Sequence, residues 1–165
     1  MKKLIIAGGG TGGHLFPGIA IAEEFKRRFP EADIVFVGTR HGLEKNVIPE
    51  LGFRLEFVSA KGFKRRFTKA IFVFPYHLLR SFYQSLVLLR KIKPDFVVGT
   101  GGYVSGPVVL AAFFKNIPTL IQEQNSYPGV TTRILSLFVD RVCLAYESSK
   151  RYFALKKNSW SLVIQ

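Results

Sequence analysis

Cysteine, acidic side chains and long apolar runs are all scarce in this sequence. Among 165 residues there is one cysteine, Cys143, so an internal disulfide framework is excluded. Cys143 lies in an apolar stretch without an activating neighbour, which favours core packing over reactivity. The most hydrophobic window, residues 70–89, is interrupted by Pro75, His77 and Arg80. Because a charge in mid-span is costly in hydrocarbon, we expect no transmembrane helix there.

Bases outnumber acids by more than two to one. The chain has 24 Lys and Arg against 11 Asp and Glu, a formal net charge of +13. Between residues 61 and 94 there is no acid at all. This balance suits a negatively charged partner, whether a nucleic acid, an anionic membrane or a phosphorylated substrate. A hydrophobic content of 48% excludes a disordered chain, and the length suffices for one domain with its own core.

Short apolar runs alternate with longer helical stretches along the chain. Strands are expected at residues 3–7, 33–38, 54–59, 95–99, 119–122 and 141–144. Helices are expected at residues 17–29, 41–51, 68–92, 104–114 and 131–138. This alternation predicts an α/β fold, a doubly wound, Rossmann-like parallel sheet whose ligands bind at the carboxyl ends of its strands. The final residues start another apolar run, so we expect a missing segment or a partner to complete the fold.

A glycine-rich turn between the first strand and the first helix is the most informative segment. Five glycines lie between residues 8 and 13, followed by His14 and by Pro17, which suits a first helical turn. Glycines let backbone N–H groups approach a ligand, and a helix N-terminus favours an anion. The segment predicts a phosphate-bearing ligand beside an imidazole that titrates near neutral pH. The spacing also fits a dinucleotide fingerprint, but the second strand ends in Gly38-Thr39-Arg40 without the acid that holds a ribose, which disfavours a nicotinamide cofactor.

Two further polar segments follow later strands. Residues 99–107 again read as a strand, a glycine turn and a helix start, which suits an anion site or merely a close helix–sheet crossing. Residues 122–125 place Gln-Glu-Gln-Asn at the end of the fifth strand. Amide and carboxylate groups both suit sugar hydroxyls, although a helix-capping turn is the alternative. Glu123 is also a candidate base or a partner that orients His14.

Residues 9–14, 101–107 and 123–125 together resemble the signature loops of the MurG family of N-acetylglucosaminyltransferases. The resemblance spans nearly the whole chain and concerns the amino-terminal domain of a two-domain, GT-B enzyme. It implies two Rossmann-like halves across a cleft, of which the carboxyl-terminal, donor-binding half has no counterpart in this sequence. We therefore expect residues 1–165 to form an acceptor-binding domain that is inactive alone. The alternative is a non-catalytic module that anchors a separate catalytic chain to a membrane.

The resemblance also implies a reaction and the residues that serve it. Family members transfer N-acetylglucosamine from UDP-N-acetylglucosamine to lipid I, with inversion, and give lipid II for peptidoglycan. His14 is the leading base and Glu123 its rival. The donor would contact Thr11, Gly12, Gly13 and Asn125. The lipid-linked acceptor would contact Gly10, Gly102, Tyr103, Ser105 and Gln124. We expect no metal, because no side-chain cluster has ligand spacing, and no cofactor besides the two substrates.

The acid-free stretch interleaves bases with aromatic side chains. A plain core helix with Leu79, Phe82, Leu86 and Leu89 inward explains part of it. The remaining aromatics and the lack of acid predict a peripheral membrane patch, because bases and apolar side chains both favour an anionic lipid surface. The patch comprises Lys64, Arg65, Arg66, Lys69, Phe72, Phe74, Tyr76, Leu79 and Arg80. We expect it at the cytoplasmic face of the bacterial inner membrane, and we disfavour nucleic acid, which leaves the glycine turns unexplained.

Overall fold

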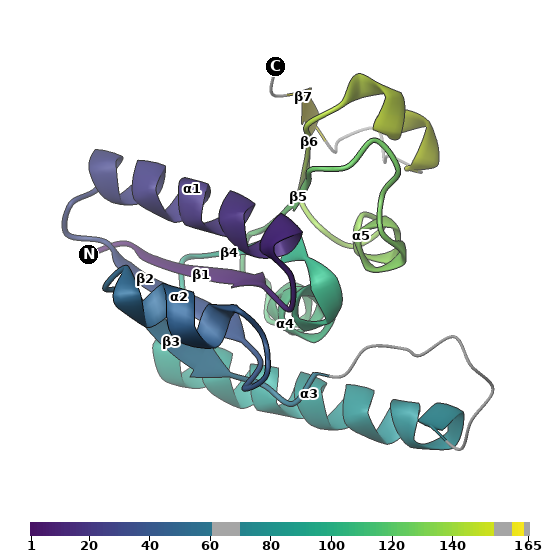
Figure 1. Ribbon diagram of the computed structural model, residues 1–165, viewed down its shortest axis with the longest axis horizontal. Helices are drawn as coiled ribbons and strands as arrows, with labels where there is room; N and C mark the ends of the chain where they lie inside the picture. Colours follow the sequence, from purple (N-terminus) through teal and green to yellow (C-terminus); the bar gives the residue numbers. More distant parts are fainter. Residues whose placement is uncertain (61–69, 154–159, 164–165) are drawn as a thin grey trace.

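A parallel sheet with helices on both faces forms the structure (Figure 1). The computed structural model describes residues 1–60, 70–153 and 160–163, and side chains for residues 1–60 and 75–153. Within that part, seven strands pair in the order β3-β2-β1-β4-β5-β6-β7, all parallel. The strands are β1 Lys3–Gly8, β2 Asp33–Gly38, β3 Arg54–Phe57, β4 Phe96–Gly101, β5 Thr119–Glu123, β6 Arg141–Leu144 and β7 Trp160–Val163.

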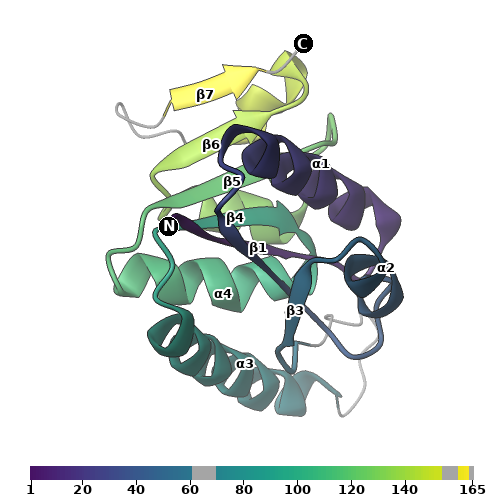
Figure 2. The same cartoon turned by 90° about the vertical axis from the view of Figure 1, so that its left-hand side faces the viewer.

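The helices divide between the two faces of the sheet (Figure 2). One face carries α1 and α2, and the opposite face carries α3, α4 and α5. Their bounds are α1 Gly12–Arg28, α2 Glu44–Glu50, α3 Ala70–Ile92, α4 Gly102–Phe114 and α5 Val130–Leu135, followed by the 3-10 helix η1 Glu147–Tyr152. The predicted doubly wound, Rossmann-like sheet is confirmed.

Alternation along each strand builds the two apolar cores. In β1, Leu4 and Ile6 pack with α1 and α2, while Ile5 and Ala7 pack with α3 and α4. Because successive side chains of a strand point to opposite faces, a strand covered on both faces must be apolar throughout. The central strands of this chain read in that way, which is why their positions follow from the sequence.

The helix starts differ from the predicted ones, and the difference matters for function. Helix α1 begins at Gly12 rather than at Pro17, which lies inside the helix. Helix α4 likewise begins at Gly102 rather than at residue 104. The adjacent glycines that we expected to form loops therefore form the first turns of two helices. His14 consequently stands in the first turn of α1 and not in a loop.

The strand order reverses between β1 and β4. From β1 the chain proceeds outward to β2 and β3, and from β4 it proceeds the other way to β5 and β6. The helices that follow β1 and β4 lie on opposite faces, so their first turns diverge from neighbouring strand ends. Such a switch point is where open α/β sheets bind ligands. We use the term switch-point rim for residues 8–14, 100–105 and 123–125.

Candidate functional site at the switch-point rim

Helix α1 starts at the rim with unsatisfied backbone donors. Thr11 is its N-cap, but the Thr11 side chain makes no capping hydrogen bond, and the first turn contains no acid. The N–H groups of Gly12 and Gly13 have no carbonyl within the helix to bind, because the first turn of a helix lacks one. Helix α4 has the same features, with Gly101 as its N-cap. Two helix ends with partial positive charge thus lie at one rim.

The His14 side chain joins these two helix starts. Its Nδ1 atom lies 3.2 Å from the carbonyl oxygen of Thr100 at the end of β4. In return, the buried Thr100 hydroxyl donates to the carbonyl oxygen of His14 at 2.7 Å. The Nε2 atom has no hydrogen-bond partner among the described residues and is open to solvent. The imidazole is therefore fixed through one nitrogen and free at the other.

Two glycines of the second turn make room for this ring. A Cβ atom on Gly101 would lie 2.4 Å from Nδ1 of His14, and one on Gly102 would lie 2.6 Å from the carbonyl oxygen of Gly9. Both glycines also have positive φ angles, 105° and 78°. Side chains other than hydrogen are strained in that region. These two residues are glycine because His14 and the first turn pack against them.

The first glycine turn encloses a buried carboxylate, Glu44, which the sequence analysis did not single out. Glu44 is fully buried at the start of α2. Its Oε2 accepts the N–H of Gly10 at 2.9 Å, and its Oε1 accepts the N–H and hydroxyl of Thr39 at 2.7 and 3.0 Å. A Cβ atom on Gly9, Gly38 or Gly42 would overlap this side chain. Glu44 therefore holds the turn from beneath, and three glycines exist to make space for it.

Only part of the first turn is left open for a ligand. A Cβ atom on Gly10 meets nothing within 4 Å, and one on Gly13 meets only the Thr11 hydroxyl, at 4.0 Å. Both glycines are exposed, as is Thr11. Because the N–H of Gly10 is bound to Glu44, the donors that remain for an anion are those of the first turn of α1. Gly10 offers space rather than a hydrogen bond.

Ser105 is expected to contact the acceptor, but the structure places its side chain inside the protein. It is buried, and its Oγ accepts the N–H of Gly101 at 2.9 Å. The hydroxyl hydrogen is shared between the carbonyl oxygens of Ala7 at 2.6 Å and Gly101 at 2.8 Å. No hydrogen of Ser105 is left for a ligand. The side chain instead ties the end of β1 to the first turn of α4.

Glu123 likewise makes its hydrogen bonds within its own loop. It is buried, and one carboxylate oxygen accepts the backbone N–H and the side-chain amide of Asn125 at 3.0 and 2.8 Å. The other oxygen accepts the N–H of Gly129 at 3.1 Å. The expected contact between Glu123 and His14 is replaced by one from the next residue, because Gln124 Nε2 lies 2.8 Å from His14 Nδ1. Gln124 thus faces His14 rather than standing free for the acceptor.

The remaining predicted rim residues are exposed. Tyr103 on the first turn of α4 is 56% exposed, and Asn125 is exposed on its loop. Neither makes a described hydrogen bond to His14. Both therefore leave their outer surface free at the rim. The structure brings His14, Gln124, Gly101 and Gly102 into contact, whereas the side chains of Thr11, Tyr103 and Asn125 make no described hydrogen bond to His14.

Part of the predicted membrane patch lies on α3. The helix exposes Tyr76, Leu79, Tyr83 and Val87, at 59%, 68%, 67% and 46%, and Arg80 is exposed beside them. Their spacing of three and four residues makes one stripe along the helix. The expectation that Leu79 points inward is wrong. Lys64, Arg65, Arg66 and Lys69, and the side chains of Phe72 and Phe74, lie outside the described residues.

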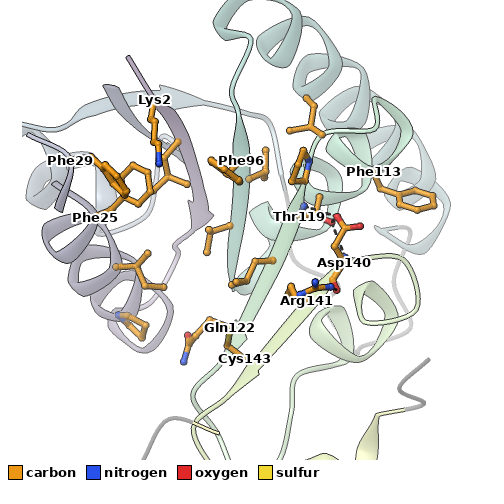
Figure 3. A pocket seen from close by; sticks show the side chains of 18 of the residues that line it. Lys2, Phe25, Phe29, Phe96, Phe113, Thr119, Gln122, Asp140, Arg141 and Cys143 are labelled. Carbon is orange, nitrogen blue, oxygen red and sulfur yellow. Dashed lines mark hydrogen bonds between the residues drawn. The ribbon is translucent and has the colours of Figure 1, made fainter. Parts of the chain in front are cut away.

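A separate hollow of about 1080 Å³ opens on the sheet face beside α1 (Figure 3). Phe25 and Phe29 of α1 line one side, and Phe96, Leu120 and Cys143 of the strands line its floor. Cys143 is half-buried on this floor rather than packed within the core, and burial raises the pKa of its thiol. The lining is mostly apolar, and the hollow lies away from His14 and the glycine turns. It does not coincide with the switch-point rim.

The described residues contain neither a membrane-spanning helix nor a cluster of metal ligands. None of their helices is both long enough and apolar enough to cross a bilayer. Nor do those residues gather three His, Cys, Asp or Glu side chains into a group able to hold a metal ion.

Comparison with known proteins shows the family of this chain. Residues 4–144 match the glycosyltransferase family 28 N-terminal domain. The chain belongs to glycosyltransferase family 28. The matched residues include His14, both glycine turns and, except for Lys3, every strand that borders the rim.

Individual members of family 28 agree with this assignment. The chain is 49% identical to a protein of Ruminiclostridium cellulolyticum and 50% identical to one of Syntrophus aciditrophicus, each over 155 residues, 94% of this chain and 43% of the relative. Both bear the name UDP-N-acetylglucosamine–N-acetylmuramyl-(pentapeptide) pyrophosphoryl-undecaprenol N-acetylglucosamine transferase. The crystal structure of Acinetobacter baumannii MurG superposes with a TM-score of 0.80 at 25% identity, covering 100% of this chain and 46% of that one.

The chain thus spans less than half the length of these relatives. The crystal structure of a UDP-N-acetylglucosamine 2-epimerase from Neisseria meningitidis shares the fold at 16% identity with a TM-score of 0.65. At that identity the likeness concerns the fold alone. The predicted kinship with the MurG family is confirmed, for the amino-terminal part of its members.

Proposed function

We propose that this chain is the acceptor-binding domain of an enzyme that transfers N-acetylglucosamine from UDP-N-acetylglucosamine to lipid I and gives lipid II. One observation carries the proposal: two helix starts free of acids and of side-chain caps meet around a half-buried imidazole at the switch-point rim. The names of the relatives supply the reaction. Both substrates carry a diphosphate, which is the group that such helix ends attract.

In this proposal, different residues at the rim bind the two substrates. The N–H groups of Gly12 and Gly13 face one diphosphate, and the first turn of α4 with Gly102 and Tyr103 faces the other. Thr11 and Asn125 lie beside the donor sugar. The acceptor hydroxyl attacks the anomeric carbon, its proton passes to the base, and the bond from that carbon to UDP breaks with inversion. Backbone dipoles supply the positive potential, so the proposal includes no metal and no cofactor.

His14 is the base in this proposal. Its Nε2 is open to solvent, whereas both carboxylate oxygens of Glu123 accept hydrogen bonds within their own loop. A base must reach the hydroxyl proton within hydrogen-bond distance, and a free imidazole nitrogen at the rim meets that need. Glu123 in turn shapes the loop that carries Asn125 and Gln124.

The exposed stripe on α3 is the proposed membrane contact. Tyr76, Leu79, Tyr83 and Val87 give it apolar area, and Arg80 gives it positive charge. Apolar side chains entering the lipid interface and bases near anionic headgroups both strengthen binding, by about 1 kcal/mol for each base. A lipid-linked acceptor would then be met at the cytoplasmic membrane surface. The carboxyl-terminal, donor-binding half of the relatives is required for turnover, so this chain alone is inactive.

Transfer of radiolabelled N-acetylglucosamine to a short-chain lipid I tests this function. An active enzyme in which this chain is joined to a carboxyl-terminal domain should give labelled lipid II, and this chain alone should give none. His14→Ala should lower kcat about 10²–10⁴-fold with little change in the KM for the acceptor. His41→Ala, at an exposed histidine, is the matched control. Unchanged turnover in His14→Ala would remove His14 from the mechanism, and turnover by this chain alone would overturn the domain assignment.

A further inference from the structure

Gln124 follows β5 and turns its side chain toward His14. Its amide nitrogen lies 2.8 Å from Nδ1 of the imidazole. The carbonyl oxygen of Thr100 lies 3.2 Å from the same nitrogen. The second amide atom, Oε1 of Gln124, is buried and has no hydrogen-bond partner among the described residues. One ring nitrogen thus has two polar neighbours, and one of these neighbours is incompletely bonded.

These neighbours decide where the ring hydrogen lies. A carbonyl oxygen only accepts, so the Thr100 contact is a hydrogen bond only when Nδ1 carries the hydrogen. An amide NH₂ beside that N–H sets a donor against a donor. A half-turn of the Gln124 amide brings Oε1 to this place, where it gains the partner that it lacks. The ring hydrogen then has two acceptors.

The opposite tautomer is unfavourable at this position. With the hydrogen on Nε2, Nδ1 accepts the Gln124 NH₂ at 2.8 Å, but its lone pair also faces the lone pairs of the Thr100 carbonyl oxygen at 3.2 Å. Oε1 of Gln124 would also remain buried without a donor. Leaving a buried polar atom unpaired is costly, and native structures rarely do so. The Nδ1–H form with the amide turned removes the lone-pair clash and pairs Oε1, and it places the Gln124 NH₂ at the buried position that Oε1 held.

We propose that Gln124 is a positioning residue that, with the Thr100 carbonyl, holds the hydrogen of neutral His14 on Nδ1 and leaves the Nε2 lone pair free. This inference rests on the proposed function, in which Nε2 takes the proton of the acceptor hydroxyl as the new glycosidic bond forms and UDP leaves. The imidazolium that results keeps its Nδ1–H between two acceptors. The carboxylate of a Ser-His-Asp triad orients its histidine through the same nitrogen.

Nitrogen NMR of this chain labelled at histidine reads the tautomer directly. The chain has three histidines, His14, His41 and His77, so a His14→Gln variant assigns the signals. At a pH where the ring is neutral, we expect His14 to show a pyrrole-type Nδ1 and a pyridine-type Nε2. Exposed histidines prefer the opposite form, and His41 supplies that reference in the same spectrum. A pyrrole-type Nε2 at His14 overturns the proposal.

Variants then assign the effect to Gln124. Gln124→Met removes the acceptor with little change in size and should move His14 toward the Nε2–H form. Gln124→Glu keeps an acceptor and should retain Nδ1–H. Gln122→Met, two residues earlier and within β5, is the matched control and should leave His14 unchanged. If His14 keeps Nδ1–H in Gln124→Met, the Thr100 carbonyl alone sets the tautomer and the proposal fails.

Kinetics separate this inference from the proposed function. In an active enzyme containing this chain, Gln124→Met should lower kcat about 10–100-fold, part of the effect of a general base, with KM nearly unchanged. Gln124→Glu should retain most of the turnover, which a merely steric role would not predict. Because the NMR measurement uses no substrate, it gives its answer even if His14 proves not to be the base. A Gln124→Met enzyme with normal kcat, despite a changed tautomer, would contradict the proposed function and leave the positioning role intact.

Discussion

Replacing Glu44 by glutamine should weaken the hydrogen bonds that hold the first glycine turn, while the size of the side chain stays nearly the same. The carboxylate accepts three hydrogen bonds, two on Oε1 from Thr39 and one on Oε2 from the N–H of Gly10. A glutamine keeps an oxygen for Thr39, but its NH₂ must then face the Gly10 N–H, which loses its acceptor. A hydrogen bond to a charged group contributes about 1.5–3 kcal/mol, and an unpaired donor adds to the loss. We therefore expect Glu44→Gln to lower the free energy of unfolding by about 2–3 kcal/mol.

Urea unfolding followed by circular dichroism measures this change, with an unaltered m-value showing that the unfolding transition itself is the same. In a chain of this length the loss corresponds to a drop in Tm of roughly 4–12 °C. Glu50→Gln is the matched control, since this substitution makes the same chemical change at an exposed position of the same helix. If the two variants unfold within about 0.5 kcal/mol of each other, Glu44 does not hold the turn and the reasoning is refuted.

Three further results are expected. Ser105→Ala should cost about 2–4 kcal/mol in urea unfolding, because two buried backbone groups lose their partner. Cys143 should react slowly with a thiol reagent in the native state and quickly in urea, and its native rate should rise only at higher pH, because burial raises the thiol pKa. Hydrogen bonds from Arg27 and Arg28 lower the pKa of Glu24 to about 2, so its stabilising effect, measured against Glu24→Gln, should be present above pH 4.5 and be lost as the pH falls toward 2.

Each of these results has a control in the same chain. Ser126→Ala removes an exposed hydroxyl without described hydrogen bonds and should be nearly neutral. A Cys143 thiol that reacts equally fast in native and unfolded protein would show that burial does not suppress its ionisation. Glu23→Gln, one residue before Glu24, removes an exposed carboxylate without a described partner. The same pH dependence in both glutamate variants would mean that the arginine contacts do not matter.

Much of the fold follows from the sequence because the central strands are covered on both faces. Runs such as Leu4–Ala7 and Ile34–Val37 must be apolar throughout. Their short length and the glycines that follow them distinguish them from the longer apolar helix α4. The rotation of α3 does not follow in the same manner. Helix α3 buries Ser81 and Ser85 and leaves Leu79 68% exposed, so an apolar pattern that assigns Leu79 inward gives the wrong phase.

The glycine turns show a second limit of sequence reasoning. The sequence favours a ligand opening for the glycines of residues 8–13, yet Gly9, together with Gly38 and Gly42, surrounds the Glu44 side chain. Gly101 and Gly102 similarly make room for His14 and its turn. A pattern of glycines indicates that a side chain would not fit at those positions, but it does not indicate which group occupies the space. Glu44 itself, at residue 44 in a plain helix start, gives no local signal, because its partners are 5 and 34 residues away.

Titration of the ¹⁵N-labelled chain with a short-chain lipid I, followed through its backbone amides, tests the central claim most directly. The account predicts saturable shifts at Gly12, Gly13, His14, Gly102 and Tyr103, and inorganic pyrophosphate should compete for the same amides. Shifts confined to the hollow lined by Phe96 and Leu120, or no saturable shift at the two helix starts, would show that the rim does not receive a diphosphate-linked sugar.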